Sequence, residues 1–234
     1  MINYTEAAAP TAELAKPGTY AVVADIHGQY DLLMQALKRI EEIGIRKIVF
    51  LGDYVHRGPD SPKVLQHLMN PPEGWEYICL CGNHEDMELQ DFGAGGQGWG
   101  YSGTLDKYGI DEMRKYYAPL VLEEVIDWMS RLKICHFEGD NVFAHAYYNY
   151  TLAPSEQNRQ ECLWRRLMSN SSYGSPYLFL THGHTPHGYP HVDIGDNRLN
   201  LDIGGMYGRE LLVGIFKDEL KGPLGFMHVV KNLH

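Results

Sequence analysis

Three short apolar runs each end directly before a cluster of polar residues. The runs lie at 20–24, 47–51 and 77–81, and the clusters read DIHG at 25–28, GDYVHRG at 52–58 and GNHE at 82–85. Runs rich in β-branched and aromatic residues are typical of buried strands. Open α/β sheets carry their ligand sites at the carboxyl ends of strands. If the three strands lie side by side, the three clusters meet at one rim of one sheet.

The segments between these runs predict two helices. Residues 29–43 and 61–69 place apolar side chains at helical spacing, and Ser61 and Pro62 suit an N-cap and a first helical position. With the first strand at 18–24, the β-α-β-α-β order implies parallel strands and an α/β fold class. Further elements are predicted as helices at 118–129 and 156–168 and strands at 132–137, 141–145, 177–180, 200–203, 211–216 and 226–230.

Length and composition restrict the class of protein. With 234 residues, 44% of them hydrophobic, we expect one domain over 1–234, with residues 1–17 loosely attached. A net charge of −10 and a pI near 5.6 argue against general binding to nucleic acid or anionic membranes. The sequence shows no 18-residue apolar run and no secretory signal, which favours a cytoplasmic protein without a membrane span.

Two smaller features complete the prediction. The four cysteines show no CxxC spacing, so we expect buried, reduced thiols. The glycine-dense segment 92–103 contains no phosphate-loop pattern, and it predicts a flexible surface segment that acts as a lid.

The polar clusters contain the ligand types that bind divalent cations. Asp25 and His27 stand two residues apart just beyond a strand, so both side chains can face one ion. Asp53 follows the next strand and can bridge two ions through its two carboxylate oxygens. The other candidate ligands are Asn83, His145 and His184. Carboxylate, amide and imidazole ligands suit manganese, iron or zinc, and two cations about 3.5–4 Å apart can clamp an in-line phosphoryl displacement.

Each of these residues taken alone has a more ordinary interpretation. A single Asp or Asn after a strand commonly forms a turn or caps a helix, and a single His commonly lies in the core or on the surface. We assign such structural roles to His182, His187 and His191. The metal-site interpretation is favoured because the polar cluster recurs at three strand ends.

Five motifs occur in an order that resembles one known family. They are DIHG at 25–28, GDYVHRG at 52–58, GNHE at 82–85, His145-Ala146, and GHTP at 183–186. This set resembles the phosphoprotein phosphatase (serine/threonine phosphatase) branch of the calcineurin-like metallophosphoesterases, in the compact bacterial and phage lambda form, over residues 18–216. The resemblance implies a central β-sandwich of mixed sheets flanked by helices, with a dinuclear manganese, iron or zinc site.

The resemblance also implies roles for individual residues. Asp25 and His27 would bind the first metal ion, Asp53 would bridge, and Asn83, His145 and His184 would bind the second. His84 would act as the general acid, without a covalent phosphoenzyme. Arg57 and Arg166 would hold phosphate oxygens next to Asn83, because a planar guanidinium suits bidentate phosphate binding. For Arg166, in a Trp-x-Arg context, the alternative is a solvated helix face.

His56 departs from the family pattern, which has Asp at this position. That Asp hydrogen-bonds the catalytic histidine and fixes its orientation. A neutral His56 accepts a hydrogen bond from His84 but supplies no negative charge, so we expect a lowered pKa for His84 and weaker general-acid catalysis. His56→Asp is then expected to raise turnover at pH 7. Asp60 and Asp86 are alternative carboxylate partners for His84.

Three functions are compatible with these motifs. The first is a metal-dependent phosphomonoesterase that acts on phosphoserine, phosphothreonine or phosphotyrosine proteins through a metal-activated water. The second is a dinucleoside polyphosphate hydrolase, and the third is a catalytically impaired phosphate-binding regulatory protein. A nucleic-acid phosphodiesterase is disfavoured because this acidic chain shows no basic stripe.

Overall fold

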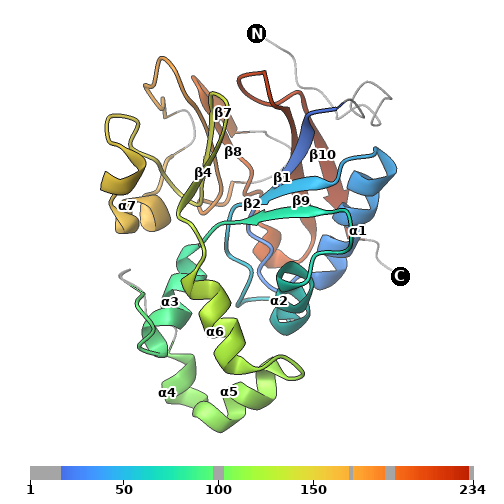
Figure 1. Ribbon diagram of the computed structural model, residues 1–234, viewed down its shortest axis with the longest axis vertical. Coiled ribbons are helices and arrows are strands. Elements are labelled where there is room, and N and C mark those ends of the chain that lie inside the picture. Colours follow the sequence, from blue (N-terminus) through green and yellow to red (C-terminus); the bar gives the residue numbers. More distant parts are fainter. Residues whose placement is uncertain (1–16, 97–102, 169–170, 188–192, 232–234) are drawn as a thin grey trace.

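Two β-sheets pack face to face at the centre of the protein, with helices outside them (Figure 1). The computed structural model describes residues 17–96, 103–168, 171–187 and 193–231. Most of the N-terminal segment expected to attach loosely, residues 97–102 of the glycine-dense segment, and His191 therefore lie outside the described residues. Within the described ranges, none of the helices is both long and apolar enough to cross a membrane.

The first sheet contains the three strands predicted to carry the polar clusters. Its strands, in spatial order, are β10 (Gly225–Val230), β9 (Glu210–Lys217), β1 (Thr19–Val23), β2 (Lys47–Phe50) and β3 (Glu76–Cys79). Strands β1, β2 and β3 are parallel, while β9 runs antiparallel to its two neighbours, β1 and β10. Helices α1 (Tyr30–Glu42) and α2 (Ser61–Met69) connect the parallel strands, which confirms the predicted β-α-β-α-β order.

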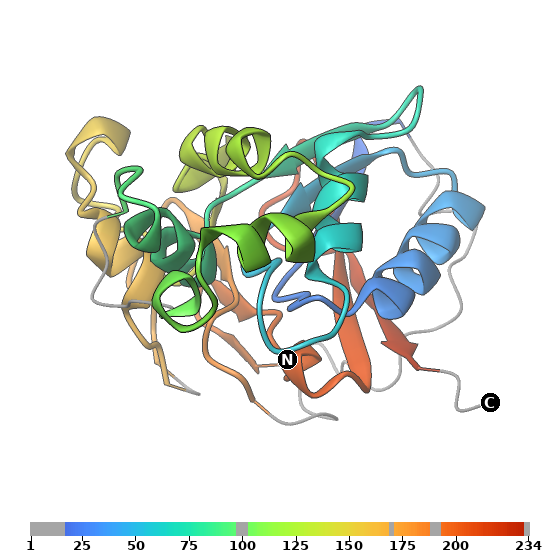
Figure 2. The same ribbon diagram turned by 90° about the horizontal axis from the view of Figure 1, so that it is seen from below.

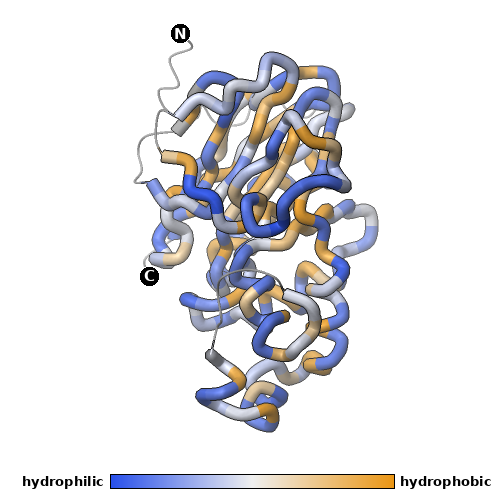
Figure 3. Tube along the Cα trace, turned by 90° about the vertical axis from the view of Figure 1, so that its left-hand side faces the viewer, coloured by the Kyte–Doolittle hydropathy of each residue, from blue (hydrophilic) through white to orange (hydrophobic). Residues whose placement is uncertain are grey.

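Strand β1 shows why its sequence is an unbroken apolar run. Tyr20 and Val22 face the core between the two sheets, whereas Ala21 and Val23 face the core beneath the helices. Successive side chains of a strand point to opposite faces, so a strand covered on both faces is apolar at every position. In Figure 3, hydrophobic stretches run along the central strands.

The second sheet is also mixed and completes the predicted β-sandwich. Its strands, in spatial order, are β4 (Cys135–Glu138), β5 (Asn141–Ala144), β6 (Phe179–His182), β8 (Arg198–Asn200) and β7 (Asp193–Gly195). Strands β5, β6 and β8 are parallel. Phe143 of β5 joins the two sheets, with its ring centroid 5.9 Å from that of Tyr20 and 5.5 Å from that of Phe216.

A group of helices extends from one end of the sandwich, in the lower part of Figure 1 and the foreground of Figure 2. These helices are α3 (Asn83–Asp91), α4 (Thr104–Tyr108), α5 (Ile110–Tyr117) and α6 (Leu122–Ser130). The remaining helical segments are η1 (Pro154–Glu156), α7 (Arg159–Trp164) and η2 (Gly205–Tyr207). Tyr117, Leu122, Val125 and Met129 anchor the group to the core beneath α1 and α2.

Several sequence predictions were wrong in detail. The helix predicted at 156–168 ends at Trp164, so Arg165 and Arg166 follow the helix rather than lie on its face. The helix predicted at 118–129 begins at Leu122, and the strand predicted at 200–203 ends at Asn200. All four cysteines are free, but Cys79 and Cys135 are only partly buried.

Helix α3 was not predicted at all, and its composition explains why. Its buried side chains include Glu85, Asp86 and Glu88, with only Leu89 apolar. Hydrophobic periodicity is the main signal for a helix, and an acidic buried face does not produce it. Buried acidic groups need hydrogen-bond partners or cations, so the start of this helix is a candidate for part of a functional site.

Candidate metal centre

The loops that carry the polar motifs adopt an uncommon backbone conformation. Asp25, His27, Asp53 and His184 all have positive φ angles, of 43°, 46°, 55° and 66°. His56 and Arg57 share this conformation, and Asn197 is the one further non-glycine case among the described residues. Positive φ costs free energy for residues with a Cβ atom, and such strain tends to concentrate at functional sites.

Glycines let the motif loops touch. A Cβ atom on Gly52 would collide with the backbone of Gly82, and one on Gly82 would collide with Asp53. A Cβ atom on Gly183 would collide with Asp25 Oδ1. The loops after β1, β2, β3 and β6 therefore approach each other more closely than any other residue at these positions allows.

Glu85 fastens two of these loops together. Its Oε2 accepts hydrogen bonds from Asp53 N at 2.8 Å and Gly82 N at 2.9 Å. Its Oε1 accepts from Tyr54 N at 2.7 Å and Val55 N at 3.2 Å. Sequence reasoning gave Glu85 no role, although a Glu three residues after the N-cap residue Gly82 can accept the Gly82 N–H as the Glu of a capping box does.

Three histidines each donate one ring N–H to a backbone carbonyl. His27 Nδ1 lies 3.1 Å from Val55 O, His145 Nδ1 3.0 Å from Leu51 O, and His184 Nε2 3.2 Å from Trp164 O. A carbonyl oxygen only accepts, so each of these nitrogens carries the proton. The second nitrogen of each neutral ring then has a free lone pair, as in a metal-ligating histidine.

These lone pairs point at the oxygens of Asp53 and Asn83. His27 Nε2 lies 3.5 Å from Asp53 Oδ2, and His145 Nε2 lies 3.4 Å from Asp53 Oδ1. Asn83 Oδ1 lies 2.9 Å from both His145 Nε2 and His184 Nδ1. The potential ligand atoms form two groups that share Asp53, namely His27–Asp53–His84 and Asp53–His145–His184. Acceptors that face acceptors in this way suit a pair of bound cations.

A cluster of buried carboxyl groups supports the same conclusion. Asp25, Asp53 and Asp202 are all buried, and Asp25 Oδ1 has no hydrogen-bond partner among the described residues. Burial and the neighbouring carboxylates raise the pKa of Asp25 well above its usual value, and burial raises that of Asp202 to about 7. Burial lowers the pKa of His145 to about 3, so this ring offers no positive charge near neutral pH.

The sequence-predicted ligands thus converge from five loops, which follow β1, β2, β3, β5 and β6, and Asp25 lies beside them. Its Oδ2 accepts a hydrogen bond from His184 N at 2.9 Å, and its carboxyl group contacts that of Asp202. Asp202 was missed, because LDI at 201–203 was interpreted as part of a strand. Its signal is positional, since it follows β8 much as Asp25 follows β1.

His84 lies beside this centre, with Nε2 3.9 Å from Asp53 Oδ2. Its Nδ1 lies 2.8 Å from His56 Nδ1. Burial lowers the pKa of His84 to about 4. A lowered pKa was expected from the sequence, but from the missing negative charge at position 56 rather than from burial. The alternative carboxylate partners were wrong. Asp60 pairs with Lys63, and Asp86 pairs with Arg159, each at 2.7 Å.

Two exposed arginines border the centre. The charge of Arg57 acts on His84 and that of Arg166 on His184, in each case lowering the pKa of the histidine after the larger effect of burial. Neither guanidinium has an ion-pair partner among the described residues. Arg165 is engaged elsewhere, because its guanidinium lies 3.9 Å from the ring centroid of Tyr147. Arg57 and Arg166 are therefore available to an anionic ligand.

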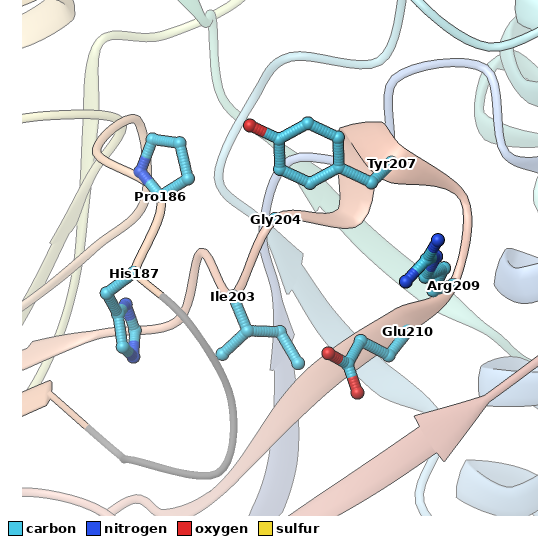
Figure 4. Close-up of a pocket in the computed structure, with 7 residues that line it drawn as sticks. All are labelled: Pro186, His187, Ile203, Gly204, Tyr207, Arg209 and Glu210. Atoms are coloured by element: carbon cyan, nitrogen blue, oxygen red, sulfur yellow. The ribbon is translucent and has the colours of Figure 1, made fainter.

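A pocket of about 630 Å³ adjoins the loops that carry His184 and Asp202. In Figure 4, Pro186 and His187 lie on one side and Arg209 and Glu210 on the other, with the ring of Tyr207 between them at the top. The pocket has room for the part of a substrate that lies beyond a phosphate group.

Comparisons with known proteins agree with this geometry. The calcineurin-like phosphoesterase family matches residues 18–212. Serine/threonine-protein phosphatase 2 of Escherichia coli K12 is 32% identical over 154 residues, which cover 61% of this chain and 66% of that protein. The symmetrical bis(5'-nucleosyl)-tetraphosphatase of Dechloromonas aromatica is 32% identical over 129 residues, which cover 55% of this chain and 43% of that protein. The chain thus spans less than two thirds of the length of either relative.

A solved structure supports the fold alone. The cold-active protein-tyrosine phosphatase of a psychrophilic Shewanella is 15% identical, with a TM-score of 0.57 over 89% of this chain and 80% of that one. The resemblance seen in the motifs is confirmed by the family match, which spans all five of them. This chain belongs to the family of calcineurin-like metal-dependent phosphoesterases.

Proposed function

We propose that this protein is a phosphomonoesterase that removes phosphate from phosphorylated serine, threonine or tyrosine side chains of proteins. The observation that carries the proposal is the convergence of three histidine lone pairs on Asp53 and Asn83 between two exposed arginines. The similarity to serine/threonine-protein phosphatase 2 supports this choice of substrate.

The residues divide into ligands and substrate-binding groups. The proposed metal ligands are Asp25 and His27 for one ion, Asp53 for both, and Asn83, His145 and His184 for the other. Two divalent cations, manganese by preference and iron or zinc as alternatives, would acidify a water molecule and offset charge on the phosphoryl oxygens. Asp202 stands next to Asp25 and adds to the negative charge that favours cations.

The chain's own residues then orient and protonate the substrate. Arg57 and Arg166 hold phosphate oxygens on the exposed side of the centre, and their planar guanidinium groups fix the orientation of the phosphate. His84 directs Nε2 toward the same space and donates a proton to the leaving oxygen.

A dinucleoside polyphosphate hydrolase is the second candidate. It is favoured by the similarity to the Dechloromonas aromatica enzyme and by the pocket in Figure 4, where the exposed ring of Tyr207 and the guanidinium of Arg209 could hold a nucleotide. The third candidate, a phosphate-binding protein without catalysis, is disfavoured because all the expected ligand types are present.

Hydrolysis assays separate these functions. With Mn²⁺, the protein is expected to hydrolyse p-nitrophenyl phosphate and to release phosphate from phosphoserine and phosphothreonine peptides. Asp53→Asn is expected to abolish both activities. Preferred release of ADP from diadenosine tetraphosphate would instead establish the second candidate. Bound metal without turnover of any phosphoester would establish the third.

A further inference from the structure

Glu88 is a buried carboxylate on α3 for which sequence reasoning found no role. Only 2% of its surface is exposed. Its Oε1 lies 2.7 Å from His56 Nε2 and accepts a hydrogen bond from the Tyr117 hydroxyl at 3.2 Å. Its Oε2 accepts a hydrogen bond from Thr104 Oγ1 at 3.3 Å. Three groups of the surrounding structure thus fix the position of this carboxylate in a place where water is excluded.

His56 connects Glu88 to His84 through its two ring nitrogens. Its Nε2 donates to the Glu88 carboxylate, and its Nδ1 lies 2.8 Å from His84 Nδ1. A hydrogen bond between two imidazole nitrogens contains one proton, which either ring can hold. Glu88, His56 and His84 therefore form a continuous chain that ends at His84 Nε2, on the side of the metal centre.

We propose that Glu88 and His56 are positioning residues that together replace the single Asp of the family at this position. They orient His84 and return to it the proton that it gives to the leaving oxygen. This inference rests on the proposed function, because it concerns protonation of the leaving group at the same centre. It assigns a role to Glu88 and reinterprets His56, which by sequence alone implied a weakened general acid.

The proton balance of the step is complete. Before reaction, His56 carries protons on both nitrogens and pairs with the Glu88 carboxylate, while His84 carries a proton on Nε2. When the bond from phosphorus to the leaving oxygen breaks, its electron pair stays on that oxygen and binds the Nε2 proton. The His56 Nδ1 proton passes to His84 Nδ1, and both rings end neutral. The starting state is restored when His84 Nε2 takes a proton from the water that enters for the next cycle and the His84 Nδ1 proton passes back to His56 Nδ1.

The electrostatic surroundings of His56 favour the ring with protons on both nitrogens. Burial disfavours the charged ring, yet the hydrogen bond and the charge of Glu88 outweigh burial and raise the pKa of His56 above its usual value. A protonated His56 beside an ionised Glu88 is a charge-assisted pair, which is stronger than a neutral hydrogen bond.

The dependence of the rate on the leaving group tests this inference. Nitrophenolate leaves without a proton, whereas phenolate is more basic and needs one. In Glu88→Gln, which keeps the shape of the side chain but removes its charge, kcat for phenyl phosphate is expected to fall about 10- to 100-fold. The kcat for p-nitrophenyl phosphate is expected to change much less. Equal losses for both substrates, or no loss for either, would overturn the proposal.

A double-mutant cycle adds a second criterion. His56→Asp places a carboxylate next to His84, so Glu88→Gln is expected to lose most of its effect on phenyl phosphate in that background. If the effects of the two substitutions on kcat simply multiply, the residues do not act as a unit and the proposal fails.

Asp91→Asn is the matched control for Glu88→Gln, because Asp91 is another buried carboxylate of α3 that binds Thr104 and not His56.

A measurement without turnover separates this inference from the proposed function. In the metal-free protein labelled with ¹⁵N-histidine, NMR is expected to show coupling across the His56 Nδ1–His84 Nδ1 hydrogen bond. Absence of that coupling would contradict the chain of hydrogen bonds. If the parent protein hydrolyses neither aryl phosphate, the proposed function fails, whatever the NMR result shows.

Discussion

The amide oxygen of Asn83 lies 2.9 Å from His184 Nδ1, although 101 positions of the chain separate the two residues. Asn83 is the first residue of α3, which follows β3 of the first sheet, and His184 follows β6 of the second sheet. The proposed second cation would thus bind between the two halves of the sandwich. Metal binding should therefore stabilise the whole fold rather than one loop.

Thermal unfolding provides the first test of this arrangement. Added Mn²⁺ is expected to raise the Tm of the parent protein, since a ligand at 100 times its Kd contributes about 2.7 kcal/mol to folding free energy. Asp53→Asn should remove most of this shift, because Asp53 is shared by both ligand groups. Asp127→Asn, an exposed carboxylate of α6, serves as the control and should retain the full shift. Equal shifts in all three proteins would contradict the assignment of Asp53.

Glu85 provides a test that does not involve metal. Its two carboxylate oxygens accept hydrogen bonds from Asp53 N, Tyr54 N, Val55 N and Gly82 N. Glu85→Gln turns one acceptor into a donor that faces N–H groups, so urea unfolding should show a loss of about 2–4 kcal/mol. Glu41→Gln on the exposed side of α1 should change stability by less than about 0.5 kcal/mol. A Glu85→Gln protein as stable as the parent would show that the loops do not depend on this carboxylate.

The pairing of His56 with Glu88 predicts a pH dependence of stability. Burial opposes the charged form, but Glu88 outweighs it and raises the pKa of His56 above its unfolded value. Such a group stabilises the fold fully below its unfolded pKa, and this contribution is lost as pH rises through the folded pKa. Glu88→Gln should therefore destabilise the metal-free protein more at pH 5.5 than at pH 9, a difference that urea titrations at both pH values measure. The same loss at both values would mean that His56 is neutral throughout.

The exposed arginines predict a selective loss of phosphate binding. Removal of one charge-assisted hydrogen bond costs about 1.5–3 kcal/mol, so Arg57→Ala and Arg166→Ala should each weaken inhibition by inorganic phosphate about tenfold or more. Arg165→Ala should have little effect, because Arg165 stacks on Tyr147 instead. Inhibition constants measured with p-nitrophenyl phosphate as substrate provide the comparison. If Arg165→Ala weakened inhibition as much as Arg166→Ala, the assignment of the second arginine would be wrong.

The amino-acid sequence by itself predicted the β-α-β-α-β succession of elements in the first half and the ligand types at each strand end. Both depend on local signals. An apolar run stopped by Gly52 or Gly82 marks the end of a strand, and Asp25, Asp53 or Asn83 follows it directly. The ordered motifs then identified the family, since their spacing along the chain is visible without any coordinates.

Only the tertiary structure decided which groups surround His84 and the proposed ligands. Glu88 lies 32 positions from His56, and it lies on a helix whose buried face is acidic and therefore carries no apolar period. Asp202 contacts Asp25 because β8 and β1 belong to sheets that pack against each other. Hydrophobic patterns show which face of an element is buried, but they do not show which buried polar groups meet across the core.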